Sequence, residues 1–583
     1  MDILLSDELF WRTPPRVTRN YRQGRFGQLH YRLAVPQTEL LGQAMNKTPL
    51  LLLHSIPNSS RMYNQLLAEM GRDRIAIAID TPGFGLSDPP LFQPSIDDYS
   101  ACIGEFIAEM GEELGFQRVD LFGYQLGSKI AARLARQQPK FVRRIVLVSA
   151  PVYTNEEITQ QQTSLNAPLI DPWSTSGEAL KHYWQDHWRR RDELSGDWLV
   201  QREVAERLFN LEQMHAADLA EIAVQHHEEL PLIEHPLLMI CPGDDLREYA
   251  LRAQSLIRNG KLIDRQHWAD GFLDVRTNES ASLLRDFLDG VADDRGQETV
   301  SLVAPPIENT KAMSPMLRRG FYAGPYGPLH YRMATGPAGS DGLQPHRPIV
   351  LLHMSPNSSR VFDSLLLSLA ASRPVLALDT PGFGESEAPQ QPIGIEEFAA
   401  ATLELIDALG FDEIDVLGYH TGAMTAIELA LLSPLRIRHV VQISSPIYTP
   451  EEQQRARHLY RARELQTDGS HLVDAWRNMQ KFYNKDVPPA VLVRNFTSSL
   501  RGGPMSHWGH QAAFTYPLAK KLPLVAQPVL VVNPEDDLVD KTRRAPELLQ
   551  RGRLHELPGR AHGFLDQMPE EFTQLLVDFL DDF

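Results

Sequence analysis

His420 stands between two glycines, Gly418 and Gly422, directly after a strand-like apolar run and before a helix-forming stretch. A neutral imidazole attacks acyl groups, and with an ordinary pKa of about 6.5 it also takes protons from water or from a carbon acid. An earlier position with the same flanking glycines holds Gln125, whose amide neither attacks nor accepts a proton at neutral pH. The sequence therefore predicts that the residue at position 420 can act as a nucleophile or base and that the residue at position 125 cannot.

The two positions belong to a repeat that runs through the chain. Four runs return in the same order, at an offset that drifts only from 300 to 292 residues: Leu-His-Tyr-Arg from Leu29 and Leu329, Pro-Asn-Ser-Ser-Arg from Pro57 and Pro356, Asp-Thr-Pro-Gly-Phe-Gly from Asp80 and Asp379, and Gly-Phe-Leu-Asp from Gly271 and Gly563. This indicates a duplicated domain rather than a solenoid. We expect domains at 1–290 and 318–583, joined by a polar, proline-bearing linker at 291–317, and we expect the two domains to pack on each other.

Short apolar runs alternate with helical patterns inside each copy. In the second copy the runs predicted as buried strands begin at Ile349, Val375, Ile414, Val440 and Val529, and residues 395–409 have the spacing of an amphipathic helix. Strands that alternate with helices predict an α/β fold with a doubly wound, mostly parallel sheet. Segments rich in helix formers, about 151–235 and about 447–525, are predicted to form a helical cap over each sheet.

The charge and the hydrophobic pattern of the chain limit the kinds of partner and location that we expect. The chain has 583 residues and a net charge of −18, which argues against nucleic acid and anionic membranes as partners. The first residues have no basic run, and no stretch approaches the length of a membrane span, so a cytoplasmic location is expected. Cys102 and Cys241 both stand in apolar runs and are predicted to be buried thiols rather than a disulfide.

Five motifs occur in the same order in a known family. In the second copy they are the loop from His353 to Ser359, the turn from Asp379 to Ser386, the glycine-flanked His420, the turn that ends in Asp537, and the loop that holds His562. Together they resemble the oxyanion loop, the Asp-x-Pro-Gly turn, the nucleophile elbow, the acid turn and the catalytic-histidine loop of the α/β-hydrolase superfamily. The resemblance is nearest to its capped branch of epoxide hydrolases, dehalogenases, C–C hydrolases and esterases, and it covers nearly all of both copies.

The resemblance implies roles in the second copy. It places His420 at the nucleophile position, His562 within hydrogen-bond reach of it, and Asp537 as the group that orients His562. It also implies an oxyanion hole of backbone N–H groups, from Thr421 after the elbow and from Met354 or Ser355 in the first loop. Met354 replaces the usual glycine there, which weakens the case for acyl chemistry.

Three interpretations of His420 stay open. It is a nucleophile or general base tuned by His562 and Asp537, or the three bind a divalent metal as a facial triad, or the site is inert and only binds. Because the family is not a metal family, neither a metal nor another cofactor is expected. Candidate pocket residues are His353, Tyr419, His507 and Trp508; His353 is expected to orient its own loop, and the cap residues have an ordinary structural role as the alternative.

The first copy lacks the same groups. Alignment of the Gly-Phe-Leu-Asp runs places Asp270 where the catalytic histidine belongs, and Gln125, Asp245 and Asp270 make no triad. His267 lies three residues before Asp270, out of register with the motif. We expect a non-hydrolytic copy that serves packing, substrate capture or completion of the pocket.

The leading hypothesis from sequence is a cofactor-independent enzyme that acts on a small or medium organic ester, lactone or C–C bond in the second domain. A lyase, isomerase or decarboxylase that uses His420 as a base is the first alternative. The other is a catalytically inert protein that binds a small ligand or a partner through its caps. The step from fold to substrate rests on analogy alone.

Overall fold

The structure, a computed structural model, describes residues 8–36, 47–165, 173–290, 317–335 and 346–581. Contacts between α-carbons divide the chain into two compact units, residues 1–171 with 183–314 and residues 172–182 with 315–583. The linker predicted at 291–317 lies outside the described residues except for its last position.

The first unit contains an eight-stranded sheet in the order β1-β2-β4-β3-β5-β6-β7-β8. Strand β2 pairs antiparallel with β1 and β4, and the remaining neighbours are parallel. The strands are β1 (Val17–Gly24), β2 (Gly27–Ala34), β3 (Leu50–Leu53), β4 (Ala76–Ile79), β5 (Val119–Tyr124), β6 (Val142–Val148), β7 (Leu237–Pro242) and β8 (Gly260–Arg265). The main helices beside them are α3 (Asn64–Met70), α4 (Ile96–Leu114), α5 (Leu126–Gln137) and α13 (Thr277–Leu288).

The second unit repeats this topology in the order β16-β15-β14-β13-β11-β12-β10-β9. Its strands are β9 (Leu317–Gly324), β10 (Gly327–Ala334), β11 (Ile349–Leu352), β12 (Val375–Leu378), β13 (Ile414–Tyr419), β14 (Ile437–Ile443), β15 (Val529–Pro534) and β16 (Gly552–Leu557). Its main helices are α14 (Asp363–Ala370), α15 (Ile395–Ala408), α16 (Thr421–Leu432) and α24 (Pro569–Asp581). The predicted α/β class is confirmed in both copies.

Each sheet buries both of its faces, which explains why its central strands are apolar without alternation. In β11, Val350 and Leu352 join a cluster with residues of α15 and α16, whereas Ile349 and Leu351 join another with residues of α14 and α24. Because successive side chains of a strand point to opposite faces, the two clusters lie on the two sides of the sheet. Burial of a leucine of this kind stabilises the fold by roughly 1.5–3 kcal/mol.

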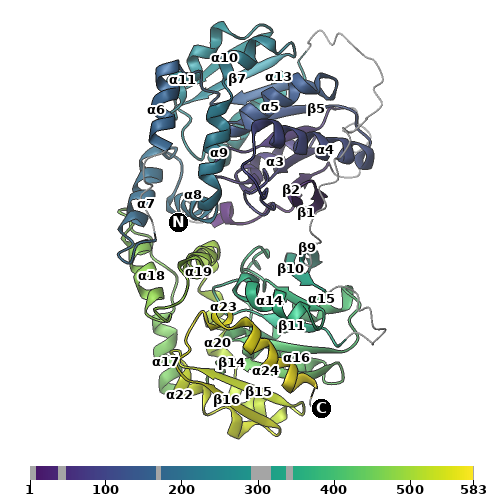
Figure 1. The fold of residues 1–583 in the computed structure, drawn as a ribbon, viewed down its shortest axis with the longest axis vertical. Helices are drawn as coiled ribbons and strands as arrows, with labels where there is room; N and C mark the ends of the chain where they lie inside the picture. Colours follow the sequence, from purple (N-terminus) through teal and green to yellow (C-terminus); the bar gives the residue numbers. More distant parts are fainter. Residues whose placement is uncertain (1–7, 37–46, 166–172, 291–316, 336–345, 582–583) are drawn as a thin grey trace. The chain divides into compact units, whose positions relative to one another are not determined.

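Helical segments are inserted between the fourth and fifth parallel strands of each unit, as predicted. In the first copy they are α6 (Asn155–Leu165), α7 (Glu178–Arg190), α8 (Asp197–Phe209), α9 (Leu211–Ala223) and α10 (His226–Glu229). In the second they are α17 (Pro450–Leu459), α18 (Ser470–Gln480), α19 (Pro489–Arg501) and α20 (Trp508–Thr515) (Figure 1).

Residues 172–182 of the first cap belong to the second unit. The Trp173 ring lies 5.4 Å from that of Trp476 and 6.2 Å from that of Phe496, centre to centre. The indole Nε1 of Trp476 donates to the carbonyl of Ser174 at 2.9 Å. The sequence did not predict this segment, because its contacts join residues about 300 positions apart.

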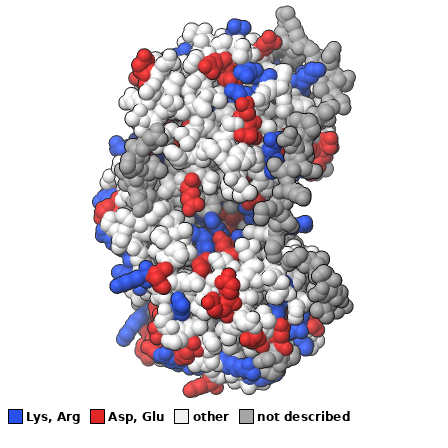
Figure 2. All heavy atoms as spheres, in the orientation of Figure 1, with Lys and Arg blue, Asp and Glu red and all other residues white. Residues whose placement is uncertain are grey.

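Cys102 and Cys241 are buried and unpaired with each other, as their apolar surroundings predicted. Among the described helices none is long and apolar enough to cross a bilayer. On the face drawn in Figure 2, acidic and basic side chains are interspersed rather than gathered by sign.

Candidate functional site

The turn from β13 into α16 positions His420. Its backbone adopts φ 50° and ψ −110°, a conformation that L-residues rarely take and that costs of order 1–3 kcal/mol. The close approach of strand and helix requires the flanking glycines. A Cβ atom on Gly418 would lie 2.0 Å from the carbonyl oxygen of Gly422, and one on Gly422 would lie 2.0 Å from that of Leu352. The strain therefore presents one side chain at the sheet edge, as in a nucleophile elbow.

His420 pairs with the carboxylate of Asp536, which follows β15. Its Nε2 donates to Asp536 Oδ2 at 3.0 Å, and Asp536 also accepts bonds from Ser444 Oγ and from the backbone N–H of Leu538. Burial alone would raise the pKa of Asp536, but the hydrogen bond and charge of His420 lower it to about 2. Because an ionised carboxylate only accepts, His420 carries its proton on Nε2, and Nδ1 keeps a lone pair in the neutral ring.

The charge of Asp536 acts on His420 in return. Burial disfavours the imidazolium, yet the hydrogen bond and negative charge of Asp536, with a further contribution from Asp537, raise the pKa of His420 above its ordinary value. The side chain of His420 remains 18% exposed, whereas that of Asp536 is fully buried. His420 is thus hydrogen-bonded to a buried acid on one side, and the rest of its ring is partly accessible.

His562 forms a second pair in the same place. Its Nε2 lies 3.4 Å from Asp537 Oδ1, and the hydroxyl of Tyr419 lies 3.1 Å from its Nδ1. The rings of His420 and His562 are 5.1 Å apart, centre to centre. Each imidazole bonds a different aspartate, and no hydrogen bond joins the two rings in the described contacts, unlike the arrangement that the resemblance implied.

Asp536 is the functional residue that sequence reasoning missed. The motif drew attention to the second aspartate of the Asp536–Asp537 pair, and the turn after β15 aims the first one at the elbow instead. The one signal in the sequence was that Asp536 directly precedes Asp537 and that the first copy repeats this pair as Asp244 and Asp245.

The two histidines and two aspartates form a cluster that could hold a metal ion. His420, Asp536, Asp537 and His562 each offer a ligand atom, and these four atoms lie within 4.8 Å of one another. Imidazole nitrogens and carboxylate oxygens are ligands that Zn²⁺ accepts in a tetrahedral set. The structure therefore contains the ligands that the facial-triad hypothesis requires, and a metal assay can test it.

A cavity of about 320 Å³ opens onto this cluster. The sheet side is formed by His420, His562, Asp537 and the loop of Met354 and Ser355. The cap side contributes four aromatic rings, Tyr460, Phe482, Tyr483 and Phe496, together with polar groups that include Arg461, Arg463 and His507. Such a mixed lining suits an organic substrate that has both apolar surface and polar groups.

The predicted pocket residues separate into two groups. His507 lines the cavity, whereas His353, Tyr419 and Trp508 are not among its lining residues. His353 holds its own loop: its Nδ1 donates to the carbonyl of Met354 at 2.9 Å and its Nε2 accepts from the N–H of Thr380 at 3.0 Å. Tyr419 lies behind the site and bonds His562.

The residues predicted as oxyanion donors lie at the start of α16 and in the loop after β11. Thr421 is the first residue of α16, where a backbone N–H has no carbonyl one turn earlier to bond. Met354 and Ser355 belong to the loop after β11 and line the cavity beside His420.

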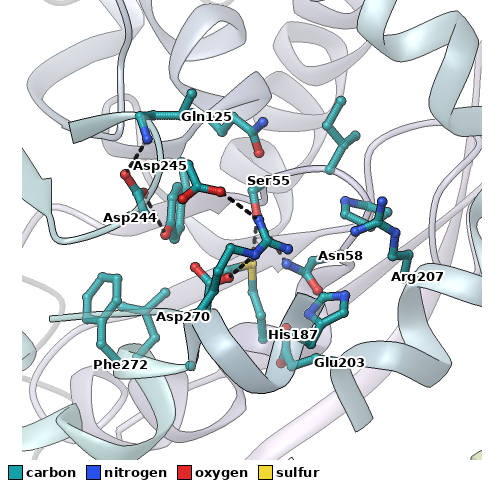
Figure 3. A pocket seen from close by; sticks show the side chains of 18 of the residues that line it. Ser55, Asn58, Gln125, His187, Glu203, Arg207, Asp244, Asp245, Asp270 and Phe272 are labelled. Atoms are coloured by element: carbon teal, nitrogen blue, oxygen red, sulfur yellow. Dashed lines mark hydrogen bonds and ion pairs between the residues drawn. The ribbon is translucent and has the colours of Figure 1, made fainter. Parts of the chain in front are cut away.

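The first copy builds the same elbow around Gln125, which has φ 49°. Asp244, the counterpart of Asp536, accepts from Ser149 Oγ and lies 3.4 Å from the hydroxyl of Tyr124. Asp245 and Asp270 face a second cavity, also about 320 Å³ (Figure 3). The structure thus brings the three predicted residues Gln125, Asp245 and Asp270 to one pocket, without a histidine at the elbow.

An arginine stands in this pocket where the second copy has an aromatic ring. Arg190 Nη1 lies 3.4 Å from Asp245 and its Nε 3.7 Å from Asp270, while Nη2 bonds Asp186 at 3.0 Å. The backbone N–H of Asp270 donates to the carbonyl of Arg190, as that of His562 donates to the carbonyl of Phe482. Sequence reasoning missed Arg190, because the caps carry no motif that aligns it.

Comparison with known proteins agrees with the fold and the repeat. Residues 48–235 match the family model described as alpha/beta hydrolase fold, and residues 349–575 match the one described as Alpha/beta hydrolase family. Serine hydrolase BPHL of Mus musculus is 26% identical over 270 residues, which cover 43% of this chain and 82% of that protein. A serine hydrolase-like protein of Danio rerio is 27% identical over 146 residues, 24% of this chain and 44% of that protein. The chain therefore spans less than half the length of the zebrafish relative.

Solved structures that resemble parts of this chain have lower sequence identity. The enol-lactonase from Burkholderia xenovorans LB400 is 24% identical, covers 45% of this chain and 99% of its own, and has a TM-score of 0.38. The esterase from Exiguobacterium antarcticum is 18% identical, covers 45% of this chain and 98% of its own, and has a TM-score of 0.38.

Proposed function

The chain belongs to the α/β-hydrolase fold superfamily, and we propose that its second domain is an enzyme that hydrolyses a small or medium organic substrate with His420 as general base. The ester, the lactone and the activated C–C bond are the bonds that such a base can cleave with water. One observation carries the proposal: the strained elbow presents a histidine to the cavity, and a buried aspartate bonds that histidine at 3.0 Å.

The proposed reaction needs no covalent intermediate. A water molecule attacks the carbonyl carbon while its proton passes to Nδ1 of His420, and the charge of Asp536 stabilises the imidazolium that forms. The negative charge on the carbonyl oxygen is taken by the N–H groups of Thr421 and of Met354 or Ser355. When the tetrahedral species collapses, the leaving group departs with the proton from the imidazolium, so that one water is consumed per bond broken.

His562 and Asp537 have a supporting role in this proposal. Their pair lies beside His420 and opens onto the same cavity, with the His562 ring 5.1 Å from that of His420. Both ring nitrogens of His562 are engaged, Nδ1 with the hydroxyl of Tyr419 and Nε2 with Asp537, so we assign His562 the role of holding Asp537 and the cavity wall beside His420.

The first domain has no part in this chemistry. Gln125 at its elbow holds no proton to exchange at neutral pH, and Asp270 replaces the second imidazole. Its role is one of binding.

A substitution copied from the first domain tests the proposal. In His420→Gln the second elbow takes the side chain that the first elbow already has in the same backbone conformation, so the fold is expected to be preserved. We expect hydrolysis of a panel of p-nitrophenyl butyrate, γ-butyrolactone and a vinylogous 1,5-diketone to fall by about 10²–10⁴-fold for every responsive compound. Gln125→Ala is the matched control and should change the rate less than twofold. Full retention of turnover in His420→Gln would exclude His420 as the base.

A non-hydrolytic use of the same base is the second candidate. It is favoured by Met354, whose side chain stands where the oxyanion loop usually has a glycine and which lines the cavity. A base without an effective oxyanion hole suits abstraction of a proton from carbon. Exchange of α-protons of a ketone in D₂O, dependent on His420 and without hydrolysis of any panel compound, would identify this reaction.

A further inference from the structure

The pocket of the first domain carries acidic side chains on its cap side, whereas none of the described residues on the cap side of the second-domain cavity is acidic. Arg190 occupies the position that Phe482 holds in the second domain, as the matching backbone bonds to Asp270 and His562 establish. Further polar groups of the cap, His187, Glu203, Arg207 and Asp218, line the same cavity. Figure 3 shows His187, Glu203, Arg207 and Asn58 around the hollow that Asp270 and Gln125 face from the sheet side. A wall of this kind binds a polar ligand rather than an apolar one.

Carboxylates outnumber cations around this cavity. Its lining carries six carboxyl side chains, Glu203, Asp218, Asp244, Asp245, Asp270 and Asp274, and two guanidinium groups, Arg190 and Arg207. The buried Arg202 bonds both Glu203 and Asp274 from outside the lining. Three carboxyl groups remain in excess after all three arginines are counted. An anionic ligand would add to this excess, whereas a cationic one would balance part of it.

Both arginines that line the cavity already interact with other side chains of the protein. Arg190 bonds Asp186 and lies within ion-pair distance of Asp245 and Asp270. Arg207 lies 3.5 Å from Asp186, and its guanidinium stacks over the ring of Tyr183 at 4.7 Å. Neither guanidinium is thus left to receive an acidic ligand without breaking these contacts.

Two other groups of the lining make no hydrogen bond or ion pair within the described residues. Asp218 makes no hydrogen bond or ion pair there, although it is half-buried on α9. His187 is only 7% exposed and makes no hydrogen bond, and its Nε2 is fully buried. Burial, with the charges of Arg207 and Arg190, holds the pKa of His187 well below its usual value, so the ring is neutral and retains an acceptor lone pair. A buried polar group without a partner is costly unless a ligand or water satisfies it.

We propose that the first-domain pocket binds a small organic cation, an ammonium or guanidinium compound, between Asp218 and Asp270, with the amide oxygen of Gln125 as a neutral acceptor. The cavity of about 320 Å³ has room for a compound of a few carbon atoms. The replacement of histidine by Asp270 and of the elbow nucleophile by Gln125 converts catalytic positions into acceptors. The first copy is then a binding domain with its own ligand, and this assignment does not depend on the chemistry of the second domain.

The raised pKa values of Asp218 and Asp270 indicate that the nearby positive charge does not fully balance these carboxyl groups. Burial raises the pKa of Asp270 to about 7, with Asp244, Glu203 and Asp245 adding to the effect and Arg190 opposing it. Burial likewise raises the pKa of Asp218 to about 7, with Glu221 adding and Arg207 opposing. A bound cation would favour both ionised forms, so binding should release protons near neutral pH.

Isothermal titration calorimetry of the full chain tests the proposal. The probes are putrescine and agmatine, with butane-1,4-diol as the neutral analogue of the diamine and succinate as an anion of similar length. We expect at least one cation to bind at one site per chain, and neither control to bind at tenfold higher concentration. Preference for succinate, or no binding of either cation up to about 10 mM, would overturn the proposal.

Four variants assign the site. Asp218→Asn and Asp270→Asn should each weaken binding of the cation at least tenfold, because each removes one charge from the pocket. Glu228→Gln changes an acid with 67% exposure on α10 of the same cap and should leave binding within twofold. Asp537→Asn, which removes the carboxylate that lines the second-domain cavity, should also leave it unchanged, which excludes that cavity as the origin of the heat.

A melting curve of each variant separates loss of the site from loss of the fold. Asp218 lies half-exposed on a helix, so its variant is expected to fold even where Asp270→Asn does not. Undiminished cation binding in a folded Asp218→Asn protein would show that the carboxylate of Asp218 does not bind the cation. An equal loss of affinity in Glu228→Gln would show that the effect is not specific to the pocket.

Discussion

Replacement of Asp536 by asparagine should weaken catalysis through the protonation state of His420. The wild-type carboxylate only accepts, which fixes the proton of His420 on Nε2, 3.0 Å from Asp536 Oδ2. An asparagine amide can instead donate to Nε2, so the ring can place its proton on Nδ1. In that tautomer the nitrogen proposed to accept a proton from water is blocked.

The size of the effect follows from the charge that is lost. Two unit charges about 4 Å apart interact by about 4 kcal/mol at an effective dielectric constant of about 20. Because the side chain of His420 is 18% exposed, we take about half of this value, about 2 kcal/mol, as the stabilisation of the imidazolium that the variant loses, so the pKa of His420 falls. The tautomer change adds to it, and together they predict a loss of about 10²–10⁴-fold in kcat/KM, in the range known for acid-to-amide changes in catalytic triads.

The assay is the pH dependence of kcat/KM for a responsive panel compound, measured from pH 5 to 9. A general base must be unprotonated, and Asp536 raises the pKa of His420, so wild-type activity should rise with pH through a value above about 6.5. In Asp536→Asn the acid limb should move to lower pH while the plateau falls. Asp244→Asn, the counterpart in the first domain, should change neither.

An NMR titration gives a second readout that needs no substrate. The His420 resonance, assigned by its loss in His420→Gln, should titrate at lower pH in Asp536→Asn than in the wild type. If that titration and the acid limb both stay in place and kcat/KM falls less than threefold, the pairing of His420 with Asp536 does not control the chemistry.

Three further predictions concern stability and metal content. Gly422→Ala should cost about 3 kcal/mol or more of unfolding free energy in urea, because its Cβ would lie 2.0 Å from the carbonyl oxygen of Leu352; Gly410→Ala, which meets nothing within 4 Å, should cost only about 1 kcal/mol. Asp379→Asn should lower the unfolding free energy by about 2–4 kcal/mol, because Asp379 accepts from buried His330 at 2.8 Å and from two backbone N–H groups. The same residue sets a pH dependence: its pKa is lowered in the folded state, so its contribution is present above about pH 4 and is lost as the pH falls further, a loss that the variant should not show. Hydrolysis should survive dialysis against a chelator, and elemental analysis should find less than about 0.1 metal ion per chain; one zinc per chain together with loss of activity on chelation would favour the facial-triad hypothesis.

Much of the fold follows from local pattern. The apolar runs at 349–352 and 375–378 are β11 and β12 without adjustment, and the helical spacing at 395–409 is α15 to within one residue. These features are readable because a buried parallel strand needs an unbroken apolar run, and a helix on the sheet needs one apolar stripe. The glycines of the elbow are equally local, because they relieve close contacts between a strand and the helix that follows it.

The sequence by itself determined that the chain is a duplicated α/β-hydrolase fold and that its two elbows carry a histidine and a glutamine. Only the tertiary structure decided which side chains meet them. Asp536 rather than Asp537 bonds His420, because the turn after β15 sets the direction of two chemically identical neighbours. Arg190 meets Asp270 from a helix 80 positions earlier, because the cap folds back over the sheet. Such pairings depend on the direction of each side chain in space, for which neither spacing nor periodicity leaves a signal.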